Sequence, residues 1–180
     1  MPDHRVRADP GAVLLLGILL YSLPFQELTA LLTAAAVHEL GHCIALTLCG
    51  SVPAGIVFSI SGPTLICSEP DATWKMPICA LSGPAAGFVF WVCLKTFWQL
   101  CAEMSLLLSV INLLPILPLD GGRVLKAFFQ YRASKLETVL SFLLPTGIMT
   151  FGLYFLYHCG KGIAFLMFGA WLLILSCQES

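Results

Sequence analysis

The sequence predicts an all-α polytopic membrane protein with about six transmembrane helices and a small β-hairpin between the second and the third. Of its 180 residues, 58% are hydrophobic and only 11% are charged, whereas an ordinary soluble domain carries about 25% charged residues. The apolar residues are gathered in long runs, as in membrane-spanning helices. This composition excludes a soluble enzyme or a disordered chain, and a net charge of −1 gives no general attraction for nucleic acid. The length predicts one domain, residues 1–180.

Six uncharged or nearly uncharged runs are the expected membrane spans. Several are shorter than the usual twenty or so residues, so a thinned bilayer or neighbouring helices would have to cover their ends. The first run is interpreted as a retained anchor, because a polar start precedes it and no small-residue cleavage site follows it. The six runs are residues 11–25, 28–49, 76–94, 104–119, 138–157 and 162–177.

The distribution of Lys and Arg predicts that both termini are cytoplasmic. With Arg5 and Arg7 on the cytoplasmic side, only Lys161 and the borderline Lys95 fall outside. This asymmetry satisfies the positive-inside rule. The remaining basic residues then lie on cytoplasmic connections: Lys75, Arg123, Lys126, Arg132 and Lys135.

Two connections carry further signals. Residues 51–75 contain the β-branched runs IVFSIS and TLICS on either side of Gly62-Pro63, which indicates a small hairpin, with an irregular surface loop as the alternative. Residues 123–137 are expected to form a basic, amphipathic segment at the membrane interface. The eight cysteines form no CxxC motif and mostly lie in apolar runs, where they are expected to pack as small hydrophobic residues.

The second predicted span contains the sequence His38-Glu39-Leu40-Gly41-His42, an H-E-x-x-H pattern. Residues i and i+4 share one helix face, so both imidazoles can bind one divalent cation. Glu39 would lie beside the open position of that ion, where it can take a proton from water. Ionisable groups inside a membrane span cost about 2–3 kcal/mol each when they have no partner. The cluster therefore predicts a metal site, and Gly41 leaves room there for a neighbouring helix.

A catalytic zinc site needs a third protein ligand, and Asp120 is the best candidate. Among the ten carboxylates, only Asp120 closes a long apolar run on the cytoplasmic side. The second and fourth predicted spans both run inward, so His38, His42 and Asp120 can converge at similar depth. The sequence NLLPILPLDGGR around Asp120 cannot be a regular helix throughout, because of its prolines and glycines. Irregular backbone at membrane depth fits a water-filled site.

Together, HELGH, the later NLLPILPLDGGR and the intervening Ser82-Gly83-Pro84-Ala85-Ala86-Gly87 resemble the site-2 protease family of intramembrane zinc metalloproteases. The core motifs cover residues 28–126. The closest variety is the compact sporulation-type branch, similar to the enzyme that processes a pro-sigma factor in endospore formers. Neither the PDZ domain nor the appended cytoplasmic nucleotide-binding domain of other members is expected here.

The resemblance implies one zinc ion per chain, held by His38, His42 and Asp120. It implies that Glu39 is the general base and that Asn112 holds the substrate backbone. Gly83 and Pro84 are interpreted as packing residues, and Arg123 as an interfacial anchor. The expected reaction is cleavage of a membrane-embedded substrate near the cytoplasmic face, with a strand of the hairpin holding the substrate extended.

Sigma-factor precursors, anti-sigma factors and leftover signal peptides all suit the family, and the sequence does not give the oligomeric state. Two alternative functions stay open. One is a catalytically silent relative that binds membrane proteins. The other is a metal transporter, although no further carboxylate interrupts the apolar runs to mark a path for ions.

Overall fold

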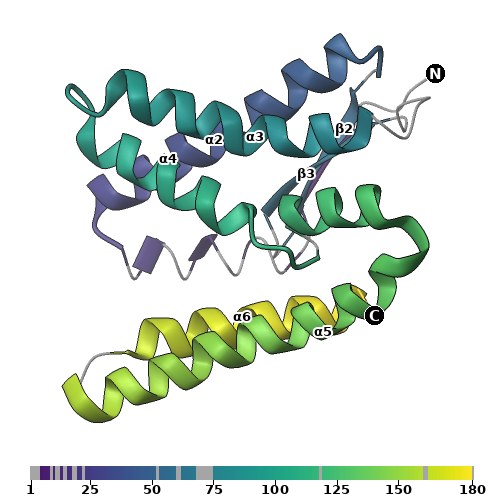
Figure 1. The fold of residues 1–180 in the computed structure, drawn as a ribbon. Coiled ribbons are helices and arrows are strands. Elements are labelled where there is room, and N and C mark those ends of the chain that lie inside the picture. Colours follow the sequence, from purple (N-terminus) through teal and green to yellow (C-terminus); the bar gives the residue numbers. More distant parts are fainter. Residues whose placement is uncertain are drawn as a thin grey trace. The chain divides into compact units, whose positions relative to one another are not determined.

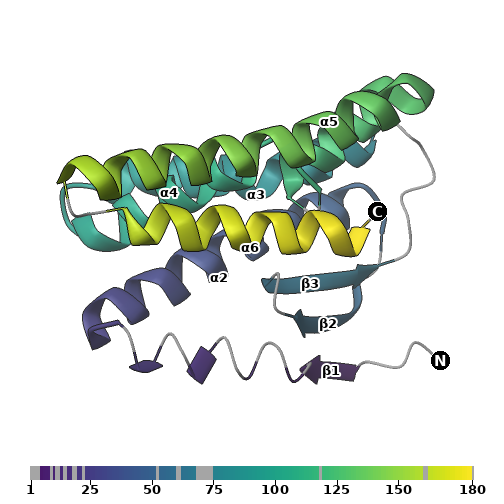
Figure 2. The same ribbon diagram turned by 90° about the horizontal axis from the view of Figure 1, so that it is seen from below.

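The computed structural model describes residues 5–8, 10, 13, 16–17, 20–21, 23–51, 53–59, 62–67, 75–117, 119–159 and 162–179. The chain divides into two compact units, Met1–Leu113 and Leu114–Ser180. Figures 1 and 2 show their elements. The first unit holds β1 (Arg5–Ala8), α2 (Phe25–Leu48), β2 (Pro53–Ser59), β3 (Gly62–Cys67), α3 (Lys75–Leu94) and α4 (Gln99–Asn112). The second unit holds α5 (Asp120–Cys159) and α6 (Ile163–Glu179).

Helices α2, α3 and α4 pack against one another, and small residues set how closely they approach. A Cβ added at Gly41 of α2 would lie 2.5 Å from the Ser82 carbonyl oxygen of α3. On α3, Gly87 leaves room for Ser105 and Ser109 of α4, and the Ser105 hydroxyl donates a hydrogen bond to the Gly87 carbonyl at 3.3 Å. Close backbone contact through small residues and interhelical hydrogen bonds is how helices associate in membranes.

The connection between α2 and α3 contains the expected hairpin, with β2 and β3 antiparallel. It belongs to a three-stranded sheet, however, because β1 pairs with β2 in parallel and the strand order is β1-β2-β3. The prediction of an all-α fold is therefore wrong. The segment RVRA is short and charged, and its partner strand lies far along the chain, so no local pattern indicates it.

The second unit is built around α5 and α6, which pack against each other. Its buried core consists of Ile116, Leu119 and Leu172. Ile116 and Leu119 belong to the irregular segment before α5, while Leu172 lies on α6. Residues 123–137, expected as a basic interfacial segment, lie in the same 40-residue helix as the fifth predicted span.

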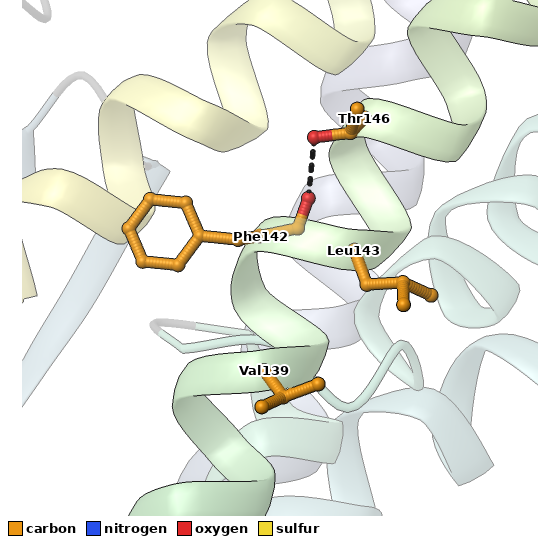
Figure 3. Close-up of a pocket in the computed structure, with 4 residues that line it drawn as sticks. All are labelled: Val139, Phe142, Leu143 and Thr146. Carbon is orange, nitrogen blue, oxygen red and sulfur yellow. Dashed lines mark hydrogen bonds between the residues drawn. The ribbon is translucent and has the colours of Figure 1, made fainter.

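One side of α5 is apolar and exposed, as a lipid-facing helix surface should be. Val139, Phe142, Leu143 and Thr146, all on this helix, line a shallow and open hollow there (Figure 3). The Thr146 hydroxyl donates to the Phe142 carbonyl at 2.6 Å, which satisfies its hydrogen bond within the helix.

The count of six spans is wrong. Among the described residues, three helical stretches are long and apolar enough to cross a bilayer: Phe25–Leu48, Lys75–Leu94 and Val139–His158. Nearly half of the first predicted span, residues 11–25, lies outside the described residues.

The fourth predicted span overlaps a shorter apolar helix, Gln99–Asn112, and the sixth contains another, Phe165–Ile174. Helix α4 has 14 residues and is about 21 Å long, against roughly 30 Å of hydrocarbon. The predicted span extends to residue 119 because the leucines after Asn112 are apolar. The helix ends at Asn112 instead, and Pro115, which lacks a backbone N–H, does not extend it.

Candidate metal centre

Two histidines on one face of α2 form the centre of the site. His38 and His42 are one helical turn apart and buried, with 5% and 9% of their surface exposed. Their Nε2 atoms lie 3.2 Å apart. Two nitrogens bound to one tetrahedral zinc ion at 2.0–2.1 Å would be separated by about 3.3–3.4 Å. The pair is therefore spaced to share one ion, with each imidazole offering Nε2.

The other ring nitrogen of His42 faces α3. Its Nδ1 lies 2.8 Å from the backbone carbonyl oxygen of Cys79. Because a carbonyl can only accept, Nδ1 carries the proton and donates. This arrangement leaves the Nε2 lone pair for a metal, and histidine ligands in metal sites are commonly held in this way.

Gly83 provides the space that the two imidazoles occupy. A Cβ added there would clash with His42 Nε2, and would lie 2.6 Å from His42 Cε1 and 2.8 Å from His38 Nε2. Real Cβ atoms essentially never come within 3.0 Å of such neighbours. The sequence interpretation of Gly83 as a packing residue therefore understates its role, because only glycine lets α3 cover the histidine pair. Its position four residues before Gly87 is the small-residue spacing that could have indicated this.

Glu39 follows His38 on α2 and is half-buried. Asn112, the last residue of α4, uses its side-chain Nδ2 to donate to the Leu108 carbonyl at 3.0 Å. That bond within the helix leaves the Asn112 amide oxygen for another partner. The first unit thus brings His38 and His42 together, with Glu39 on the same helix, whereas the substrate-binding role of Asn112 stays a prediction.

Asp120 is the first residue of α5 and belongs to the second unit. Its side chain is 6% exposed, and its Oδ1 lies 3.8 Å from Nη1 of Arg123, which is 47% exposed. Gly122 packs against the irregular segment, where an added Cβ would lie 2.5 Å from the Ile116 carbonyl carbon. The Arg123 N–H donates to the Leu119 carbonyl at 3.1 Å. These contacts fix a buried carboxylate at a helix start, and its part in metal binding stays a prediction.

Sequence reasoning missed the groups that contact Nδ1 of His42. These are the Cys79 carbonyl and Ser82, whose hydroxyl donates to that carbonyl at 2.6 Å and lies 3.4 Å from His42 Nδ1. Backbone carbonyls leave no mark in a sequence, and a lone serine in an apolar run is usually a packing residue.

Comparison with known proteins gives consistent matches. Residues 91–153 match peptidase family M50, a region that includes Asn112 and Asp120 but not the HELGH segment. A Synechocystis protein named as a zinc metalloprotease is 33% identical over 116 residues, which is 56% of this chain and 31% of the relative. The zinc metalloprotease Rip1 of Mycobacterium bovis is 40% identical over 50 residues, 28% of this chain and 12% of Rip1. The chain therefore spans a third or less of the length of these relatives.

Among solved structures, the site-2 protease from Methanocaldococcus jannaschii has a similar fold. The TM-score is 0.73 at 18% sequence identity, over 100% of this chain and 92% of the other. At this identity the likeness concerns the fold.

Proposed function

We propose that this chain is an intramembrane zinc metalloprotease of the site-2 protease family. The M50 match, the zinc metalloprotease relatives and the fold of a site-2 protease all support this family. The observation that carries the proposal is the histidine pair of HELGH, buried in a membrane-length helix with its Nε2 atoms 3.2 Å apart. No ordinary packing role explains two imidazoles and a carboxylate in such a helix.

The zinc ion is proposed to bind His38, His42 and Asp120, one ion per chain. Two imidazoles and one carboxylate are a donor set typical of catalytic zinc, which leaves a fourth position for water or substrate. Asp120 is suited to this because its carboxylate is buried and its turn is fixed by the packing of Gly122.

When bound, zinc supplies a Lewis acid that polarises a carbonyl and lowers the pKa of water. Glu39 is proposed to remove a proton from the attacking water and later to deliver it to the leaving amine. Its position next to His38 on α2 suits this role. Cys79 and Gly83 of α3 lie against the histidine pair.

The substrate is proposed to be a membrane-embedded segment that is cut near the cytoplasmic face. A helical substrate must unwind, because its amide groups are shielded and already hydrogen-bonded. Among the described strands, β2 is paired on both sides, whereas β1 and β3 each have one open edge, and of these two only β3 belongs to the hairpin. We therefore assign β3 as the strand that holds substrate extended, with Asn112 holding the substrate backbone near the metal.

A matched pair of substitutions tests the role of β3. Neighbouring residues of a strand direct their N–H groups to opposite sides, so one of Thr64→Pro and Leu65→Pro removes a bond to β2 and the other an N–H on the open edge. One of the two should reduce cleavage while the protein keeps its thermal stability. If both variants cut normally, substrate does not add to this edge.

Several finer points belong to the same proposal. The protein crosses the membrane more than once, with both termini in the cytoplasm, as the distribution of Lys and Arg predicts. We assign it to the compact sporulation-type branch, with a sigma-factor precursor or an anti-sigma factor as substrate.

The substitution Glu39→Gln tests the proposed function. Purified protein should keep its zinc, measured by elemental analysis, while cleavage falls by about 10²–10⁴-fold because the proton acceptor is gone. Comparing the membrane proteomes of cells with either form should reveal uncut substrates. Glu103→Gln, the same change at an exposed carboxylate of α4, is the control and should cut normally.

The alternatives give different results. Wild-type protein that holds no zinc would contradict the metal site. If the membrane proteome of wild-type cells contains the same fragments as that of the Glu39→Gln cells, this result would favour a silent relative. Zinc flux into vesicles that persists in the Glu39→Gln variant would favour a transporter.

A further inference from the structure

We propose that Ser82 is a positioning residue that, together with the Cys79 carbonyl, holds His42 in the orientation that binds metal. This inference rests on the proposed function, since it concerns the zinc site. Neither group would touch substrate or ion; both would act through the imidazole of His42.

The hydrogen bonds around His42 Nδ1 fix the tautomer. The Cys79 carbonyl oxygen, at 2.8 Å, can only accept. The Ser82 hydroxyl commits its proton to the same carbonyl, at 2.6 Å. Ser82 Oγ therefore presents a lone pair to His42 Nδ1, at 3.4 Å. Two acceptors face Nδ1, which keeps the proton there and leaves Nε2 free of it.

Two glycines, Gly41 and Gly83, let α2 and α3 approach closely enough for the contact between His42 and the Cys79 carbonyl. Gly41 of α2 lies against the Ser82 carbonyl and Gly83 Cα, where an added Cβ would be 2.5 Å and 3.1 Å away. Gly83 in turn lies against both imidazoles. The two backbones are thus close enough for a main-chain carbonyl of α3 to reach a side chain of α2. Ser82 directly precedes Gly83, and its hydroxyl oxygen lies 3.4 Å from His42 Nδ1.

Ser82 also restrains the Cys79 carbonyl itself. A serine hydroxyl that bonds to the carbonyl three residues earlier holds that carbonyl in a fixed direction. Ser82→Ala would free the carbonyl and remove the second acceptor near Nδ1. Loss of partners that orient a metal-binding histidine typically weakens metal affinity by about 10–100-fold. Because the Ser82 hydroxyl is farther from His42 Nδ1 than the Cys79 carbonyl is, we expect a loss of zinc affinity at the lower end of this range, about tenfold.

The test is zinc affinity, measured in detergent by competition with a chromogenic chelator. Ser82→Ala should weaken zinc binding about tenfold, and Ser82→Thr, which keeps the hydroxyl, should restore it. The zinc-free wild type and Ser82→Ala should unfold at similar temperatures. If Ser82 acted only in packing, its loss would lower stability and leave zinc affinity unchanged. Thr33→Ala is the matched control: its hydroxyl bonds within α2, to the Thr29 carbonyl at 2.8 Å, and its loss should leave zinc affinity unchanged.

A spectroscopic measurement gives a second readout. In ¹⁵N NMR of zinc-free protein labelled at histidine, His42 should show a protonated Nδ1, and Ser82→Ala should shift it toward a mixture of tautomers. If wild-type protein binds zinc and Ser82→Ala binds it equally well with an unchanged tautomer, this inference is wrong while the proposed function stands. If wild-type protein binds no zinc, the proposed function itself fails.

Discussion

Gly83→Ala gives the sharpest test of how α3 covers the histidine pair. The new Cβ would clash with His42 Nε2 and lie 2.6 Å from His42 Cε1 and 2.8 Å from His38 Nε2. Ordinary contact needs about 3.5 Å, so these two atoms must retreat by roughly 0.7–0.9 Å, and the clashing His42 Nε2 by more. Metal–ligand distances tolerate changes of only about 0.2 Å. We therefore expect zinc affinity to fall at least a hundredfold, or about 2.8 kcal/mol.

The assay is the same chelator competition, and Gly147→Ala is its control. Both substitutions replace glycine by alanine in a helix and bring the same gain in helix propensity, about 0.5–1 kcal/mol. At Gly147 of α5 the added Cβ would meet nothing within 4 Å, so zinc affinity should not change. The reasoning is refuted if Gly83→Ala folds and binds zinc as tightly as the wild type.

Three further predictions follow from contacts in the structure. Gly87→Ala should destabilise the protein by about 1–3 kcal/mol, because the new Cβ overpacks against Ser109 Oγ. In a thermal melt, the double variant Gly87→Ala with Ser109→Ala should recover part of this loss, and no recovery would contradict the packing. Lys75→Met should lower the free energy of unfolding by about 1 kcal/mol, because the Lys75 ammonium donates a hydrogen bond to the Cys49 carbonyl after α2, at 2.8 Å. An unchanged melting temperature would show that this bond contributes nothing to stability. Asp120→Asn should weaken zinc binding by about 10–100-fold or more, since an amide is a poorer ligand than a carboxylate, and equal affinity would remove Asp120 from the ligand set.

The histidine pair is the part of the site that the sequence predicts best. His38 and His42 are four residues apart, and the helix repeat alone places them on one face. The helix repeat does not by itself fix the 3.2 Å between their Nε2 atoms, which depends on how each ring is turned. What holds the rings could not be predicted in this way, because it depends on a backbone carbonyl of α3 and on how closely two helices approach.

The fold was predicted less well where contacts are distant or apolar runs are misleading. Strand β1 forms only by pairing Arg5–Ala8 with residues of β2 about fifty positions later, a contact that no local pattern encodes. The fourth span was extended too far because hydropathy treats the leucines around Pro115 as continuous helix. In fact, the chain there turns and buries Ile116 in the core of the second unit.

The burial of Ile116 against α6 also bears on when the turn around Asp120 becomes fixed during synthesis. The turn that carries Asp120 is packed on a core completed by Leu172, more than fifty residues downstream. A nascent chain would therefore hold the HELGH helix long before this carboxylate is fixed in place. Under the proposed function, ribosome-bound chains that end before α6 should therefore not cleave neighbouring membrane proteins.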